Sequence, residues 1–239
     1  MKVLAIDTSN QALAVAICEN DQVIGQYLGT TNRNHSLVLM PAIDFLMKEN
    51  KISPKELDRI IVAEGPGSYT GLRIGVTTAK TLAWTLGIDL VGVSSLAALA
   101  ANSVDFSGYI VPLFNARREN VYTGVYQWQE GKLISIMADR HVALASWLEE
   151  LQQLDGKLRF VGTDVAAFKE SLIEVYPESV SEQWLINEVN GLSLAKLGIE
   201  VKPVLPIESF VPKYLKLVEA EENWLANHDE QRESYVEKI

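Results

Sequence analysis

The sequence predicts an α/β fold built from two halves that repeat one order of elements. Each half opens with three short apolar runs separated by brief polar breaks, a pattern typical of an antiparallel meander. Each half then alternates segments long enough for helices with short apolar runs, which is typical of crossover connections. Hydrophobic residues make up 48% of the 239 residues and charged residues 22%, the composition of a packed chain rather than a disordered one.

The first half is expected to begin with a meander of residues 2–6, 13–18 and 22–28. The apolar run at 35–49 is long enough for a helix, although Pro41 should bend or restart it. The elements expected after this helix are a helix start at 53–57, strand 59–63, loop 65–71, helix 72–86, strand 90–93 and helix 96–102.

The second half shows a similar order. Pro203 and Pro206 indicate a linker, and 219–228 is expected to be a final helix that could pack back on the first half. We place the boundary between two predicted subdomains so that they span 1–106 and 107–239. The other elements expected here are strands 109–114, 121–128 and 132–137, helix 146–154, strand 159–161 and helix 166–175.

This order of elements resembles a known architecture. Three antiparallel strands followed by alternating helices and strands, present twice, are similar to the ribonuclease-H-like fold that is duplicated in the actin, sugar-kinase and Hsp70 (ASKHA) superfamily. The resemblance implies two subdomains, each with a mixed five-stranded sheet flanked by helices. It is a repeat of architecture only, because the two halves share no quotable sequence identity.

Charge and composition exclude several classes of function. The chain carries 21 Lys and Arg against 31 Asp and Glu, a formal net charge of −10. Attraction to phosphates dominates nucleic-acid affinity, so this charge argues against a chain that binds RNA on its own. Cys18 is the single cysteine, which excludes an internal disulfide and a zinc knuckle. No apolar run approaches the ~18 residues of a membrane span, and the first run ends at Asp7, so we expect a cytoplasmic protein without membrane contact.

Four segments of the chain resemble one protein family. They read A-I-D-T-S at 5–9, N-H-S-L-V-L-M-P-A-I at 34–43, G-P-G-S-Y-T-G-L-R-I-G-V-T-T-A-K at 65–80 and V-P-K-Y-L-K at 211–216. Together they resemble the bacterial TsaB (YeaZ) family of tRNA threonylcarbamoyladenosine biosynthesis proteins. The glycine-rich motif at 65–80 is the most specific of the four.

The family resemblance implies a non-catalytic partner subunit. Such a subunit binds and activates TsaD, the paralogous enzyme that transfers the threonylcarbamoyl group to an adenosine of tRNA, together with the ATPase subunit TsaE. The resemblance also implies a homodimer when the chain is alone, and contact with tRNA that is only indirect.

The residues that catalysis would need are missing from the expected positions. TsaD carries a His-x-x-x-His metal pair, and the register of the resemblance places Ser95 and Leu99 at these two positions. Leucine cannot ligate a metal and serine is a poor ligand, so we expect no metal site and no catalytic residues. A stand-alone ATPase of the ASKHA type, or a glycoprotease-like peptidase, is the alternative.

The nucleotide site of the superfamily is only partly matched. Kinases of this fold hold phosphates with a turn after the first strand, and the matching residues are Asp7, Thr8 and Ser9. The alternative is an ordinary turn stabilised by its own side chains. On the adenosine side, Gly162 matches the first of two glycine positions, but a threonine follows it. We expect a vestigial site that binds no cofactor tightly, with ATP and magnesium bound, if at all, at the assembled complex.

Two predicted helices carry more apolar surface than one sheet face can cover. Helix 35–49 and helix 72–86 are apolar nearly all round, and small residues recur every four positions of the second. A partner that covers both helices explains this excess, whereas a well-buried internal helix pair is the alternative. Under the partner hypothesis, Gly75→Leu or Val76→Glu should break pairing and leave the fold intact. The predicted interface consists of Leu37, Met40, Gly71, Leu72, Ile74, Gly75, Val76 and Ala79.

Overall fold

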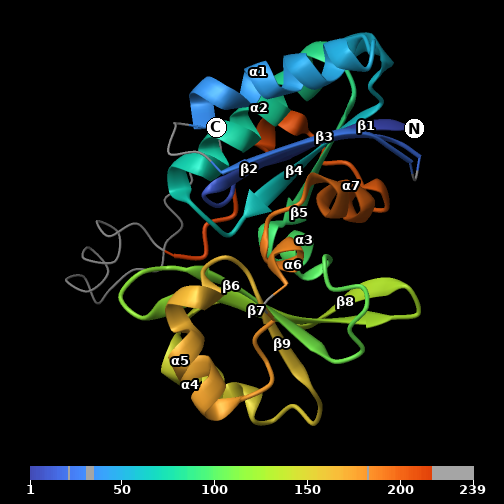
Figure 1. The fold of residues 1–239 in the computed structure, drawn as a ribbon. Helices are drawn as coiled ribbons and strands as arrows, with labels where there is room; N and C mark the ends of the chain where they lie inside the picture. The colour runs from blue at the N-terminus through green and yellow to red at the C-terminus, as the bar shows by residue number, and fades with distance from the viewer. Residues whose placement is uncertain (21, 31–34, 182, 217–239) are drawn as a thin grey trace, which may run out of the picture.

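The computed structural model describes residues 1–20, 22–30, 35–181 and 183–216 of the chain. Two sheets, each flanked by helices, lie one above the other in the view of Figure 1. The predicted α/β architecture of two halves is therefore confirmed. The expected final helix at 219–228 lies outside the described residues.

The first sheet has the five strands that the resemblance implies. They are β1 (Lys2–Asp7), β2 (Ala12–Glu19), β3 (Gln22–Thr30), β4 (Arg59–Gly65) and β5 (Asp89–Ser94). The spatial order is β3-β2-β1-β4-β5. Strand β2 pairs antiparallel with β1 and β3, whereas β4 pairs parallel with β1 and β5, so the sheet is a meander extended by crossovers.

Helices cover both faces of the first sheet. Helices α1 (His35–Glu49) and α2 (Tyr69–Leu86) lie on one face, and α7 (Gly191–Ile199) lies on the other (Figure 1). Because side chains alternate along a strand, Leu4 packs toward α1 and α2 while Val3 packs toward α7. Both faces of the central strands are therefore buried.

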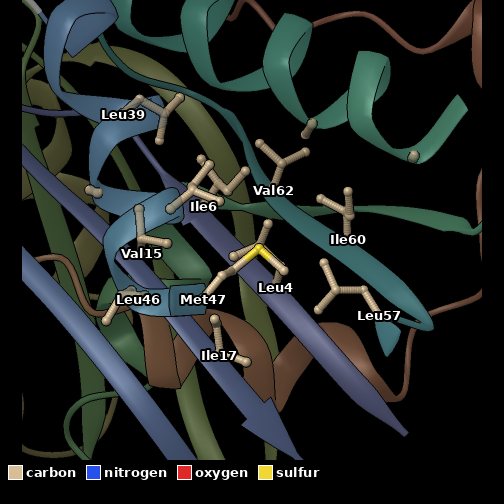
Figure 2. Packing of buried hydrophobic residues seen from close by; sticks show 14 of the residues in the cluster. Leu4, Ile6, Val15, Ile17, Leu39, Leu46, Met47, Leu57, Ile60 and Val62 are labelled. Atoms are coloured by element: carbon tan, nitrogen blue, oxygen red, sulfur yellow. The ribbon is translucent and has the colours of Figure 1, made fainter. Parts of the chain in front are cut away.

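The core on the α1 side is built from long aliphatic side chains. Figure 2 shows Leu39, Leu46 and Met47 of α1 in the same cluster as Ile6 and Val62 of the sheet, all of them buried. Each such side chain contributes about 1.5–3 kcal/mol when it is removed from water. This packing holds α1 on its sheet and determines which of its sides faces outward.

Helices α1 and α2 each differ in one respect from the sequence-based expectation. Helix α1 runs without a break through Pro41, because Pro41 and Leu37 are on its exposed side and the unpaired carbonyl there can be hydrated. Helix α2 begins at Tyr69 rather than Leu72, because the Ser68 hydroxyl accepts a hydrogen bond from the Gly71 N–H and caps the first turn.

The second sheet has four strands, which corrects the expectation of five. The strands are β6 (Tyr109–Asn115), β7 (Asn120–Gln129), β8 (Lys132–Ala143) and β9 (Leu158–Val161), in the order β8-β7-β6-β9. At the place of a fifth strand, a single parallel bridge joins Phe160 to Val180. The segment 177–183 contains one β-branched residue among polar ones and a proline, too little to build a strand.

The second sheet is also packed on both faces. Helices α4 (Leu144–Leu151) and α5 (Val165–Val175) cover the outer face, around the fully buried Trp147. Helices α3 (Ser95–Ala100) and α6 (Trp184–Asn187) lie between the two sheets, where Leu99 packs with Ala14 of β2 and Phe114 of β6. One apolar cluster thus spans both halves.

The chain returns to the first half after α6. Helix α7 packs on the first sheet, so the segment 107–239 supplies one of the helices that cover the first subdomain. The proline-containing stretch predicted as a linker instead runs beside β5, where the Val204 N–H donates to the Leu90 carbonyl at 2.8 Å. The Lys213 N–H then donates to the Glu64 carbonyl of β4 at 2.7 Å. We call residues 204–214 the strap; a short 3-10 turn (Ile207–Ser209) lies within it.

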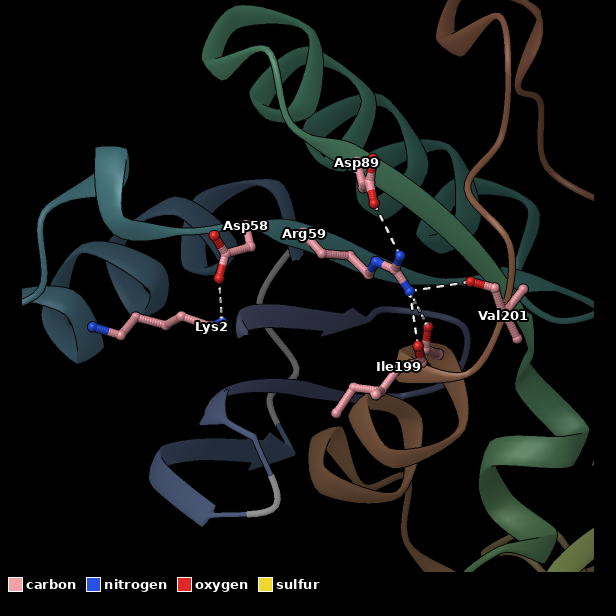
Figure 3. Close-up of polar contacts among 7 residues, drawn as sticks. Lys2, Asp58, Arg59, Asp89, Ile199 and Val201 are labelled. Carbon is pink, nitrogen blue, oxygen red and sulfur yellow. Dashed lines mark hydrogen bonds and ion pairs between the residues drawn. The ribbon is translucent and has the colours of Figure 1, made fainter.

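A buried arginine fixes the end of α7. The Arg59 guanidinium donates to the carbonyl oxygens of Gly198, Ile199 and Val201 at 2.9–3.1 Å, and to the Asp89 carboxylate at 2.9 Å (Figure 3). Carbonyls at a helix C-terminus lack partners within the helix and carry partial negative charge, so a cation satisfies them. Arg59 thereby ties together β4, β5 and α7.

None of the described helices is long and apolar enough to cross a membrane.

Candidate partner interface

Asp7, Thr8 and Ser9, the residues predicted for phosphate binding, form a turn that is held by hydrogen bonds within the chain. Asp7 is fully buried at the end of β1, and its Oδ1 accepts hydrogen bonds from the Ser9 N–H at 2.8 Å and the Ser9 hydroxyl at 2.6 Å. Burial raises the pKa of the Asp7 carboxyl, although the two bonds from Ser9 oppose that rise. The Asp7 carboxylate therefore supports its own turn, as the alternative interpretation of this segment had it.

The glycine-rich motif at 65–80 contacts this same turn. The Thr8 hydroxyl donates to the Gly71 carbonyl at 2.7 Å, and the Ser68 N–H donates to the Ser9 carbonyl at 2.7 Å. A Cβ atom at Gly71 would overlap the Thr8 carbonyl oxygen, and one at Gly75 would overlap the Thr8 hydroxyl. The small residues of α2 therefore let the helix approach the β1–β2 turn of its own chain, which corrects their assignment to a partner interface.

We expect Gly71→Ala to destabilise the chain by about 1–3 kcal/mol, because α2 must move away from the β1–β2 turn to make room for the methyl group. Urea denaturation would measure the loss. Thr81→Ala, at an exposed position of the same helix, is the control and should stay within about 0.5 kcal/mol of the unmodified chain. Equal midpoints for both variants would contradict the close approach as a source of stability.

Gly162 also contacts its own chain. It follows β9 with φ of +129°, and a Cβ there would meet the Leu113 carbonyl oxygen at 2.5 Å. Its N–H donates to the Asn187 side chain at 2.9 Å. Asp7 and Gly162 lie at the ends of strands in different sheets, and neither lines the two cavities described below.

The positions matched to the metal pair of TsaD are buried in α3. Leu99 is part of the apolar cluster between the sheets, and Ser95 is fully buried beside it in the same helix. In the part of the chain that the structure describes, no group of three or more His, Cys, Asp or Glu could hold a metal ion.

The predicted interface residues separate into two groups. Leu37 and Met40 of α1 are 71% and 47% exposed, and Ile74 of α2 is half-buried. The other five are buried within the chain, although one of them, Val76, also lines the cavity between α2 and the strap: Gly71, Leu72, Gly75, Val76 and Ala79. The sequence pattern predicted an excess of apolar surface on these helices but assigned much of it to the wrong side of α2.

Other exposed apolar residues on α1 and α2 were not among the predicted ones. Phe45 is 57% exposed, Tyr69 48% and Trp84 65%. Periodicity could have found Trp84, which lies on the side of α2 opposite Leu72 and Ala79, but not Tyr69, which lies one turn before Leu72 on the same side of the helix. Together with Leu37 and Met40 they form the surface that we call the α1–α2 face.

Two cavities open on this face. One, of about 450 Å³, lies between the helices and is lined by Leu39 and Met40 of α1 and Ile74 of α2. The other, of about 570 Å³, lies between α2 and the strap and is lined by Tyr69, Trp84 and Tyr214. Arg73 and Thr77 line both cavities, so the two hollows meet on one side of α2.

Comparison with known proteins finds relatives of one family. A family model described as "TsaD: tRNA N6-adenosine threonylcarbamoyltransferase" matches residues 19–224. The chain is 44% identical over 226 residues to the tRNA threonylcarbamoyladenosine biosynthesis protein TsaB of Bacillus subtilis, covering 94% of this chain and 98% of the relative. It is 30% identical to TsaB of Escherichia coli over 68% of this chain and 71% of the relative.

A solved structure has the same fold. YeaZ from Pseudomonas aeruginosa superposes with a TM-score of 0.73 at 23% identity, covering 90% of this chain and 99% of the other. The two sheets, their strand order and the crossover helices define a ribonuclease-H-like protein of the ASKHA class, in which the turn matched to phosphate binding is bonded to its own chain. Within that class, the chain belongs to the TsaB (YeaZ) family.

Proposed function

We propose that the chain is a non-catalytic subunit in the biosynthesis of threonylcarbamoyladenosine in tRNA. It binds and activates TsaD through the α1–α2 face and works in the cytoplasm together with TsaE. Membership of the TsaB family supports the pathway. The proposed binding through this face is supported by the exposure of large apolar side chains on two adjacent helices, where two cavities open.

The internally bonded Asp7–Ser9 turn favours a binding role over catalysis. Its side-chain oxygen atoms are hydrogen-bonded within the turn or to α2, with the exception of Asp7 Oδ2. The net charge of −10 supports contact with tRNA through the partner rather than directly. When no TsaD is present, the same apolar face would pair with a second copy of the chain.

We expect the double substitution Leu37→Asp and Met40→Asp to weaken TsaD binding at least 100-fold while the chain stays folded. Both side chains are exposed in the isolated chain, so the fold loses little, but two carboxylates would be desolvated in the complex. Isothermal titration calorimetry with TsaD and circular dichroism measure the two effects.

The matched control is Leu185→Asp, which changes a 63% exposed apolar residue of α6 in the other half. It should bind TsaD as the unmodified chain does. Wild-type affinity in the double variant would contradict the proposed face. Hydrolysis of ATP or of peptides by the purified chain alone would favour the enzymatic alternative.

A further inference from the structure

The charges on α2 are of one sign. Arg73 and Lys80 are the only charged residues among its 18 residues, in a chain whose net charge is −10. Lys80 is engaged with the strap, since its ammonium group donates to the carbonyl oxygens of Glu208 and Phe210. Arg73 makes no ion pair with any described residue.

Arg73 is nevertheless held in place. Its guanidinium donates to the Tyr69 hydroxyl at 2.5 Å and lies 5.3 Å from the centre of the Tyr69 ring. The Tyr69 ring packs on Tyr214 of the strap at 5.0 Å. A positioned guanidinium loses little side-chain freedom on binding, so this cation is prepared for a planar anion such as a carboxylate.

The position of Arg73 imposes a requirement on any protein that covers the α1–α2 face. Arg73 is exposed and lines both cavities, so a partner seated on them removes it from water. A buried cation without an anionic partner is strongly unfavourable. A partner that binds tightly must therefore bring a carboxylate to this point.

A second copy of the chain is poorly suited to that requirement. In a symmetric dimer each copy presents the same face, with Arg73 and Lys80 against one strap acid, Glu208. Asp44, an exposed acid of α1, already pairs with Lys48 at 2.8 Å. Two faces of net positive charge repel each other when they meet.

We propose that Arg73 is the residue that makes the α1–α2 face prefer an acidic partner to a second copy of this chain. The inference rests on the proposed function, because it takes TsaD to be the protein seated on the face. The apolar residues supply affinity for either occupant, and Arg73 discriminates between them by charge.

The test is Arg73→Met, which removes the charge and keeps a long apolar stem. TsaD affinity is measured by calorimetry at low and high sodium chloride, and self-association by sedimentation equilibrium. We expect TsaD binding to weaken 10- to 100-fold and to lose most of its salt dependence. Self-association should be unchanged or stronger. Arg73→Lys should restore part of the TsaD affinity, since a point charge replaces a planar fork.

The control is Lys55→Met, which removes an exposed cation from the 3-10 turn Pro54–Glu56, away from the α1–α2 face, and should change neither measurement. An equal loss of both associations in Arg73→Met would overturn the proposal, and so would unchanged TsaD affinity or an unchanged salt dependence. If Leu37→Asp with Met40→Asp abolishes TsaD binding while Arg73→Met does not, the proposed function stands and only the role of Arg73 is lost.

Discussion

Val76→Glu is expected to unfold the chain rather than to detach a partner from a folded subunit. Val76 is 3% exposed in α2 and belongs to the core cluster between α2 and the first sheet. The substitution removes a buried aliphatic side chain and introduces a carboxylate with no partner in that cluster. We expect a loss of at least about 4 kcal/mol, against a typical total stability of about 5–15 kcal/mol.

Circular dichroism during guanidinium denaturation measures this effect. The matched control is Thr77→Glu, one position further along and exposed, which should leave the unfolding midpoint close to that of the unmodified chain. A folded Val76→Glu variant with an unchanged midpoint would contradict the inward orientation of this side of α2. The expectation from the sequence pattern, that Gly75→Leu and Val76→Glu leave the fold intact, is replaced by this one.

Arg59→Met should destabilise the chain by about 3–5 kcal/mol, the range found when one partner of a buried ionic network is removed. Methionine fills part of the space but leaves the carbonyls at the end of α7 without a donor. Asp89 loses its partner as well. The loss should also appear locally. Amide hydrogen exchange in α7 should become faster in the variant than in the unmodified chain, by more than exchange in α4 does.

The control for this variant is Arg159→Met. Arg159 also makes a 2.9 Å ion pair, but its partner Asp105 is 61% exposed, so the pair is worth about 1 kcal/mol or less. Equal effects of the two substitutions would mean that the carbonyl contacts of Arg59 contribute little. If the amide hydrogens of α7 exchange as slowly in Arg59→Met as in the unmodified chain, the role of Arg59 in fixing that helix is contradicted.

Much of the fold was predictable because it depends on local periodicity. The bounds of α1 agree with the predicted run 35–49, and the meander of the first sheet was read from three short apolar runs. The expectation of a fifth strand in the second sheet came from the resemblance, whereas the apolar runs of the second half predicted only four strands, and the segment 177–183 contributes a single bridge at Val180. The return of α7 to the first half depends on contacts far apart in the chain, which periodicity does not report.

The candidate interface was likewise predictable in part from the sequence, and the rest depends on tertiary contacts. Its location on helices 35–49 and 72–86 was predicted from apolar residues in excess of what one sheet face can bury. The motif at 65–80 indicated the family. Which side of α2 faces outward was decided by the tertiary structure. Gly71 and Gly75 are the positions where α2 can approach Thr8, so these glycines face inward, and Val76 and Ala79 are buried with them. Arg73, Trp84 and Tyr69 remain on the surface. Helix α2 is apolar nearly all round, so its apolar side chains that do not pack inside the chain are exposed to solvent.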